Sequence, residues 1–298
     1  MKRLLDATSN EILSMSREDL LQAIRISEGR TILSENNVSI TQVQPMITNS
    51  EVARAFGADL ILLNCFDVFS PKVMGIEYPV DNYVFELRKL TKRPIGINLE
   101  PVDIKVSTLE NRDKISKGRI CSRETIELAS NLGFDIICLT GNPSTGVSNE
   151  AIKESIELAR KYFDGIIIAG KMHNSGIGED IIDKKNVVEF IDKGADVILL
   201  PAAGTFPGIT PDYLKELVDL IHSKKALAMS AIGTSQESSS VETIRHLAIV
   251  NKMVGFDIFH IGDHGYSGLA PYRNIMELSI AIRGESLTIR KIASSNLR

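Results

Sequence analysis

The sequence contains no tryptophan and only three cysteines. Cys65, Cys121 and Cys138 are odd in number and widely spaced, which excludes a disulfide framework and a CxxC metal site. Their expected role is that of small, buried hydrophobic residues. The sequence also lacks a long run of lysines and arginines, and its formal net charge is -4. We therefore expect no nucleic-acid partner.

Long apolar stretches are missing as well. No window approaches the roughly 20 apolar residues of a membrane span, and Asp6 interrupts the amino terminus before a signal-like segment develops. These absences predict a cytoplasmic protein with no membrane partner. Hydrophobic residues make up 43% of the chain and charged residues 24%, which is an ordinary globular composition that supports a sizeable core.

Short runs rich in Ile, Leu and Val recur along the chain, and each is followed by turn residues and then by a stretch with helical periodicity. This alternation is typical of parallel βα units, and eight such runs predict a closed (β/α)8 barrel of the α/β class, a TIM barrel. The runs are Thr31 to Ser34, Ile61 to Leu63, Ile95 to Leu99, Ile136 to Leu139, Ile166 to Ala169, Val197 to Leu200, Ala226 to Ser230 and Ile258 to Ile261.

A Gly-x-Asp tripeptide precedes every second run. The glycine is expected to end a helix in the left-handed conformation, and the aspartate to start the turn into the strand. Positions 133, 194 and 255 are spaced 61 residues apart, and this period of two βα units favours a closed barrel. An open doubly wound sheet would need a glycine-rich first turn, which is absent after the first run. The four tripeptides begin at Gly57, Gly133, Gly194 and Gly255.

One domain accommodates the whole chain of 298 residues, because α/β barrels reach about 200 to 250 residues as one unit. We predict a helical extension over residues 1–28, the barrel over 29–285 and a tail over 286–298 that is docked or partly ordered. Ser9 to Ile26 has the pattern of one or two short helices, with Ser16 and Asp19 at capping spacing. This segment is expected to cover the barrel floor or to form a subunit contact.

Catalytic groups of such barrels lie where the strands end, because the loops there converge on the barrel mouth. Polar residues at these positions are therefore the candidate site. Those predicted to bind substrate are Glu35, Asn64, Asn98, Asn142, His173 and Ser230. Those predicted to be catalytic are Glu100, Lys171, His260, Asp263 and His264.

Two of these residues carry specific roles. Asn98 and Glu100 are two apart and are expected to share the face toward the lumen, where a glutamate needs a cation, a lysine or a substrate hydroxyl; the alternative is a salt bridge at the rim. Lys171 would share a face with His173 and either hold an anion or attack a carbonyl as a Schiff-base nucleophile. Its structural alternative is pairing with Glu100 or Asp103.

The run from His260 to His264 supplies two imidazoles and the carboxylate of Asp263. These groups suit an acid/base pair that moves a proton on a sugar or keto acid, or, together with His173, a divalent metal site. The alternative for His260 is an imidazole bonded to a backbone carbonyl. No cofactor is indicated beyond this optional metal.

Two glycine-containing loops follow the seventh and eighth strands, where many barrels bind phosphate through backbone amides and hydroxyls. Pro271 marks the start of the helix after the second loop. The long loop 101–120, with Lys105, Arg112, Lys114, Lys117 and Arg119, is expected to be a lid or a solvated charged loop. We expect a small anionic metabolite, and the alternative is simple turn and capping chemistry. The predicted phosphate-binding residues are Gly233, Thr234, Ser235, Gly265, Ser267 and Gly268.

As a pattern of strands, the chain resembles the aldolase-type and ribulose-phosphate-binding barrels. Three segments are similar to those of the BtpA-like barrel family, and barrels of this type commonly form homo-oligomers. The chain also resembles bacterial barrels labelled phosphonomutase-like or dehalogenase-like, but it has no D-x-D segment and no KxCGH-type loop. The similar segments are Ile95 to Asn98, Asp135 to Gly141 and Gly194 to Leu200.

Three functions follow from these features. The first is an enzyme that acts on a small phosphorylated or carboxylated metabolite, such as a sugar phosphate, by lyase, aldolase or isomerase chemistry. The second is a metal-dependent hydrolase, although the sequence lacks an HxH pair after the first strand. The third is a non-catalytic barrel that senses a metabolite or assists assembly.

Overall fold

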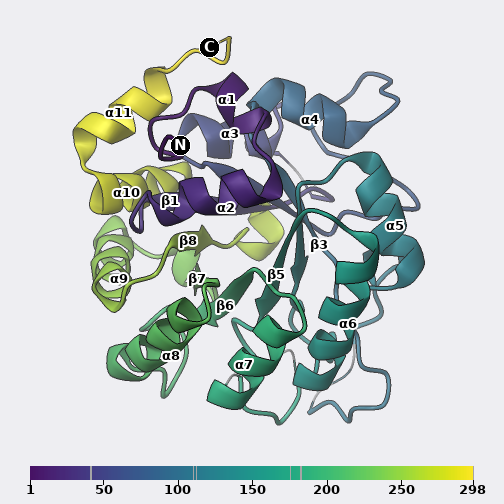
Figure 1. The fold of residues 1–298 in the computed structure, drawn as a ribbon. Coiled ribbons are helices and arrows are strands. Elements are labelled where there is room, and N and C mark those ends of the chain that lie inside the picture. Colours follow the sequence, from purple (N-terminus) through teal and green to yellow (C-terminus); the bar gives the residue numbers. More distant parts are fainter. Residues whose placement is uncertain (41, 110, 112, 175, 182, 298) are drawn as a thin grey trace.

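The chain folds into a closed barrel of eight parallel strands, in which each strand pairs with the next and β1 pairs with β8 (Figure 1). The computed structural model describes residues 1–40, 42–109, 111, 113–174, 176–181 and 183–297. The closed ring of eight parallel strands confirms the predicted (β/α)8 TIM barrel. The strands are β1 Thr31–Asn37, β2 Leu60–Asn64, β3 Ile95–Asn98, β4 Ile136–Leu139, β5 Ile166–Gly170, β6 Val197–Pro201, β7 Leu227–Ile232 and β8 Ile258–Ile261.

Helices surround the strands, and short 3-10 turns occur in three of the loops at the carboxyl end of the barrel (Figure 1). No helix among the described residues is long and apolar enough to cross a membrane. The α-helices are α1 Ser9–Leu13, α2 Arg17–Arg25, α3 Asn49–Ala55, α4 Tyr83–Thr91, α5 Arg123–Leu132, α6 Asn149–Tyr162, α7 Lys184–Asp192, α8 Pro211–Ser223, α9 Val241–Val254, α10 Tyr272–Arg283 and α11 Glu285–Ala293. The 3-10 turns are η1 Lys117–Arg119, η2 Gln236–Ser238 and η3 Gly265–Ser267.

The strands are apolar on both faces because each face meets a different apolar layer. Along β5, Ile166 and Ile168 belong to the cluster inside the barrel, whereas Ile167 and Ala169 pack against the surrounding helices. The inner cluster also contains Leu20 and other apolar residues of α2. The N-terminal helices therefore close the barrel floor, which was one of the two expected roles of this segment.

The amino-terminal helices begin where capping was expected. Ser16 accepts a hydrogen bond from the backbone N–H of Asp19, and the Asp19 carboxylate accepts one in return from the backbone N–H of Ser16. Most of the carboxyl-terminal segment forms the helix α11. Its Lys291 ammonium lies 2.8 Å from a carboxylate oxygen of Asp59, and its Arg290 pairs with Asp6 at 3.0 Å.

The four Gly-x-Asp turns have one design. Their glycines have positive φ angles between 87° and 120°, which L side chains rarely adopt. Each aspartate carboxylate then accepts a hydrogen bond from a backbone N–H at the start of the preceding strand, which ties an odd strand to the next even one. These bonds run from Ile32 to Asp59, from Ile95 to Asp135, from Ile167 to Asp196 and from Ala228 to Asp257, at 2.8 to 2.9 Å.

Gly170, the last residue of β5, has no room for a side chain. Its φ angle is 152°, and an added Cβ would overlap the backbone oxygen of Leu199 on β6. We predict that Gly170→Ala lowers the free energy of unfolding by about 3 kcal/mol, because overpacking adds to the cost of a positive φ. In urea denaturation the control Gly133→Ala should lose only about 1 kcal/mol, since its nearest neighbour is an Arg88 nitrogen at 3.7 Å. Equal losses would refute the close approach of β5 and β6.

Candidate active site

A cavity of about 680 Å³ opens at the carboxyl end of the barrel. Residues at or after seven of the eight strands line it, so it lies where the fold brings the βα loops together. The lining residues are Glu35, Asn37, Asn64, Asn98, Thr140, Gly141, Asn142, Pro143, Ser144, Met172, His173, Asn174, Gly176, Gly233, Thr234, Ser235, Glu237, Gly262, Asp263, His264, Gly265 and Ser267.

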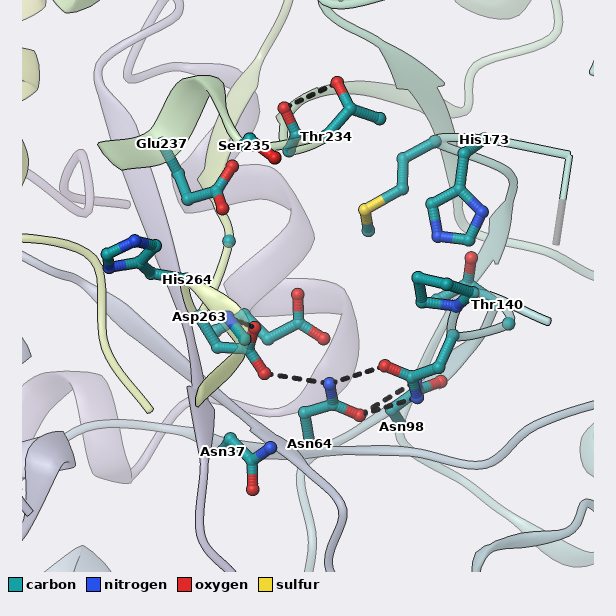
Figure 2. A pocket seen from close by; sticks show the side chains of 18 of the residues that line it. Asn37, Asn64, Asn98, Thr140, His173, Thr234, Ser235, Glu237, Asp263 and His264 are labelled. Atoms are coloured by element: carbon teal, nitrogen blue, oxygen red, sulfur yellow. Dashed lines mark hydrogen bonds between the residues drawn. The ribbon is translucent and has the colours of Figure 1, made fainter. Parts of the chain in front are cut away.

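The lining has an unusual charge pattern. Among the described residues it contains three carboxylates, Glu35, Glu237 and Asp263, and two imidazoles, but no lysine or arginine. Figure 2 shows His173 on one side of the cavity, with Glu237 and His264 on the other. Among the described residues, the lining therefore offers hydrogen-bonding and titratable side chains but no fixed positive charge.

Three asparagines of the cavity lining, Asn64, Asn98 and Asn142, form a hydrogen-bonded cluster, of which Figure 2 labels Asn64 and Asn98. The amides of Asn64 and Asn142 bond to each other reciprocally, at 2.8 and 3.0 Å. The Asn64 amide also donates to Asp263 at 2.9 Å and accepts from Asn98 at 3.4 Å. Strands β2, β3 and the loops after β4 and β8 thus meet in one network. Because Asn98 Oδ1 is buried without a partner among the described residues, the network retains an acceptor for a ligand hydroxyl.

Asp263 is the most perturbed carboxyl of this cavity. Burial raises its pKa to about 6, and the negative charge of Glu35 adds to the shift, while the hydrogen bond from Asn64 opposes it. Both oxygens are held in place, since Asn64 donates to one and the backbone N–H of Gly265 donates to the other at 2.9 Å. A fixed carboxyl with a pKa near neutrality is suited to accept and return a proton.

His260 lies one layer deeper than the cavity lining. Its side chain is fully buried, and its Nε2 lies 3.1 Å from a carboxylate oxygen of Glu35. Glu35 itself lines the cavity. The predicted catalytic histidine therefore contacts the site through Glu35 and acts as a positioning residue for that carboxylate. The alternative of a histidine bonded to a backbone carbonyl does not describe this contact.

Glu237 was not predicted as a site residue, although its loop was. It is 6% exposed, lines the cavity and has one carboxylate oxygen without a partner among the described residues. Burial raises its pKa, against the lowering effects of its own backbone N–H and of His264. Gly262 of the next βα loop lies beside this side chain, because a Cβ added there would be 3.7 Å from the Glu237 Cγ, an ordinary contact distance. The only sequence signal was an acidic residue in a serine-rich loop.

Lys171 does not line the cavity, in contrast to the prediction that it is a residue of the site. It continues the outward face of β5, its side chain has no exposed surface, and its ammonium pairs with Glu179 at 2.5 Å. Burial lowers its pKa, while Glu179 opposes that shift. The expected pairing with Glu100 or Asp103 is also wrong. The structure therefore places the Lys171 ammonium beside Glu179 and outside the residues that line the cavity.

Glu100 is buried and contacts Arg119 and Asn142 rather than the cavity. It is 1% exposed and absent from the cavity lining, and it pairs with Arg119 at 2.7 Å. Its second oxygen accepts the backbone N–H of Asn142 at 2.8 Å, and its first accepts the Asn142 amide at 2.9 Å. The rim salt bridge, which was the alternative, describes this residue, and Glu100 positions Asn142 instead of touching a ligand.

Two more predicted residues lie outside the cavity. Ser230 is fully buried and falls between Met229 and Ala231, which face the barrel interior, so its hydroxyl points toward the helices. Gly268 packs against the end of β1, where its carbonyl accepts the backbone N–H of Asn37 at 3.0 Å. Ser230 is therefore not placed to bind substrate, and Gly268 is not placed to bind phosphate.

The remaining loop residues do line the cavity. Gly233, Thr234 and Ser235 follow β7, and Gly265 and Ser267 follow β8. The hydroxyl of Thr234 is engaged internally, because it donates to the backbone oxygen of Thr205 at 2.6 Å. Any contact that Gly233, Ser235, Gly265 and Ser267 make with a ligand would therefore use backbone groups and serine hydroxyls.

The alternative metal set is not assembled. Among the described residues, which include His173, His260, Asp263 and His264, no group of three or more His, Cys, Asp or Glu side chains is placed to hold a metal ion. Burial lowers the pKa of His173, with Glu35 opposing the shift. This keeps a neutral imidazole at the cavity wall at pH 7.

The long loop after β3 crosses toward the cavity. The backbone N–H of Leu109 donates to the Gly176 oxygen at 2.8 Å, and that of Asp113 donates to the Ser144 oxygen at 3.0 Å. Both acceptors belong to residues that line the cavity. Arg112, one of the five basic residues expected in a lid, lies outside the described residues.

The fold and the position of the cavity define a TIM-barrel protein with its candidate site at the carboxyl end of the strands. The chain belongs to the family described as a domain of unknown function, DUF7916, whose model matches residues 5–298. A comparison with curated proteins finds no sequence match.

Several solved structures align with this chain at 14% sequence identity. A 2,3-dimethylmalate lyase, a PEP mutase/isocitrate lyase superfamily member, aligns over 83% of this chain and 81% of its own with a TM-score of 0.50. Thiamine phosphate pyrophosphorylase from Pyrococcus furiosus aligns over 90% and 100% with 0.46. The BexX/CysO complex of Amycolatopsis orientalis aligns over 99% and 96% with 0.49. At this identity the likeness concerns the fold alone, and the resemblance to BtpA-like barrels stays a prediction.

Proposed function

We propose that the protein is an enzyme that moves protons on a small hydroxylated carbonyl metabolite, by isomerase, aldolase or lyase chemistry. The observation that carries this proposal is the cavity lining: three carboxylates, two imidazoles and an asparagine cluster, without a lysine or arginine among the described residues. Buried carboxylates are costly unless they bind or transfer something. Proton transfer at carbon is the chemistry that needs such groups and no fixed cation.

Each group has a role in this proposal. Asn64, Asn98 and Asn142 bind the hydroxyl or carbonyl oxygens of the metabolite through their amides. Asp263 accepts the proton from carbon, because its pKa of about 6 leaves it ionised at pH 7 and still able to give the proton back. His264, which also lines the cavity, delivers the second proton. Lys171 takes no part, so the chemistry proceeds without a Schiff base.

The phosphate or carboxylate end of the metabolite is assigned to the rim. There the loops after β7 and β8 supply backbone N–H groups and the hydroxyls of Ser235 and Ser267. The acidic lining makes a doubly charged ligand costly deeper in the cavity. We therefore expect that a sugar monophosphate or a hydroxy keto acid binds better than a compact dianion such as inorganic phosphate.

The test measures binding and carbon–hydrogen exchange separately. A panel of sugar phosphates, neutral sugars, hydroxy keto acids and phosphate is screened by thermal unfolding, in which a ligand at 100 times its Kd stabilises by about 2.7 kcal/mol. Compounds that bind are then incubated with the protein in D2O and followed by NMR. Enzyme chemistry predicts deuterium incorporation at carbon that Asp263→Asn slows by about 10²- to 10⁴-fold. Binding without exchange would identify a non-catalytic metabolite-binding barrel and contradict the proposal.

A further inference from the structure

A second cavity, of about 300 Å³, lies at the opposite end of the barrel from the candidate active site. Its walls come from α2, the ends of α6 and α7, and the segments that lead into β6 and β7. Five of its lining residues are cationic, and one, Asp196, is anionic. The cationic residues are Arg17, Arg25, Arg160, Lys224 and Lys225. The charge pattern of this floor cavity is thus the reverse of that at the mouth.

The aspartates of the other Gly-x-Asp turns can be compared with Asp196 by the number of side chains that pair with each carboxylate. Asp135 has one ion-pair partner, Arg88, at 2.7 Å, and Asp257 is contacted by one imidazole, that of His222, at 2.8 Å. Asp59 has more, but its cluster is sealed from solvent by the packing of α11. One partner is therefore sufficient for this turn. The fourth turn, in the floor cavity, has several more cations than its aspartate requires.

Asp196 is already saturated. It pairs with Arg17 and, at 2.7 Å, with Arg160, and it accepts the backbone N–H of Ile167 at 2.9 Å. Burial lowers the pKa of Arg160, the charge of Asp196 opposes that shift, and the positive charge of Arg17 adds to it. The two guanidinium groups that share Asp196 thus repel each other. An additional anion would relieve this repulsion, and the protein's own aspartate has no free acceptor left to do so.

Arg25 and Lys225 have no carboxylate partner among the described residues. The Arg25 guanidinium donates to the backbone oxygen of Lys225 at 2.6 Å and to the Gln22 side chain at 3.2 Å, which fixes its plane at the cavity wall. Of its five N–H groups, these bonds use two. Lys224, in contrast, is paired with Asp192 at 2.8 Å. Two cations from two different elements are therefore available to a ligand.

We propose that the floor cavity is a binding site for a small phosphorylated metabolite, separate from the active site. A phosphate group placed between Arg25 and Lys225 would accept forked hydrogen bonds from the guanidinium and a charge-assisted bond from the ammonium. Because α2 also closes the barrel floor, a ligand here ties α2 to the segments before β6 and β7. The proposal does not depend on the function assigned to the mouth.

The test is calorimetric titration of the full chain with inorganic pyrophosphate at low ionic strength, where screening is weakest. The wild type should bind one pyrophosphate per chain with saturation. The double variant Arg25→Ala/Lys225→Ala should bind at least about tenfold more weakly, since it removes both unpaired donors. Both side chains are exposed, so the variant should fold, and its melting temperature without ligand verifies this.

A matched control removes the same charge elsewhere. Lys185→Ala/Lys215→Ala changes two cations on α7 and α8 that do not line the floor cavity. It should bind pyrophosphate with wild-type affinity. Three outcomes would overturn the proposal: no saturable binding by the wild type, equal weakening in both double variants, or undiminished binding by Arg25→Ala/Lys225→Ala. The last would place the anion at the barrel mouth instead.

Discussion

Replacing Asp59 with asparagine is expected to lower the free energy of unfolding by about 3 to 5 kcal/mol. The Asp59 carboxylate is 1% exposed and pairs with Arg283, which is fully buried at its side chain, and with Lys291. Burial opposes ionisation of Asp59, but Arg283 and Lys291 outweigh it and lower the pKa. The amide of asparagine still accepts the backbone N–H of Ile32, so the loss isolates the charge that two buried cations need. Urea denaturation at pH 7 measures it.

The control is Asp135→Asn, in the equivalent turn before β4. Asp135 accepts the backbone N–H of Ile95 at 2.8 Å in the same way, but its side chain is 34% exposed and it pairs with the single, partly exposed Arg88. Its substitution should cost no more than about 1 kcal/mol. The difference between the two variants measures burial of the ion cluster. Similar losses would mean that the turn geometry, and not the buried charge, stabilises the Asp59 site.

The fold was predictable because its signals are local. Apolar runs that alternate with helical stretches mark the strands. The Gly-x-Asp turns indicate a helix end and a strand start within three residues. The sequence did not reveal that each aspartate also accepts an N–H from the preceding strand, since this bond joins residues 27 to 40 positions apart. The helix α11 was missed as well, because its stabilising contacts, such as Lys291 with Asp59, lie far away in sequence.

The candidate site was predictable only in part, because strand residues alternate between two environments. Met229 and Ala231 face the barrel interior, so Ser230 between them cannot, yet all three positions look alike in a run that is apolar on both faces. For the same reason, the sequence does not show which face of the barrel Lys171 lies on at the end of β5. The face of a residue depends on the register of the closed barrel, and a one-residue change reverses it.

Predictions for polar residues at strand ends and in the loops placed more of them in the cavity. Each of Asn64, Asn98 and Asn142 follows or ends a different strand, and the structure joins them in one hydrogen-bonded cluster with Asp263. Glu237 was missed because an acidic residue in a polar loop is ordinarily solvated. Its side chain lies beside Gly262 of the next βα loop, and a contact between two loops has no local signal in the sequence.

For the proposed reaction, Asp263→Asn is expected to reduce turnover by about 10²- to 10⁴-fold, because the amide cannot accept a proton. In the wild type, activity should rise with pH through about 6, the pKa of this carboxyl, and the rise should be absent from the residual activity of the variant. Deuterium exchange at the substrate carbon, followed by NMR between pH 5 and 8, measures both. The control Asp103→Asn removes a carboxylate that lies outside the cavity lining and should retain wild-type turnover.

The same substitution is expected to stabilise the fold at pH 7, by about 3 kcal/mol. The pKa of Asp263 is raised from 3.8 to about 6, so its stabilising contribution is complete below pH 3.8 and is lost as the pH rises through 6. Asparagine is neutral at every pH and avoids this loss, so the gain should vanish near pH 4 in urea denaturation. If Asp263→Asn loses turnover and gains free energy of unfolding, the ionised Asp263 carboxylate serves the reaction and lowers the stability of the fold. If Asp263→Asn instead loses stability at pH 7, the carboxylate is structural and another group must accept the proton.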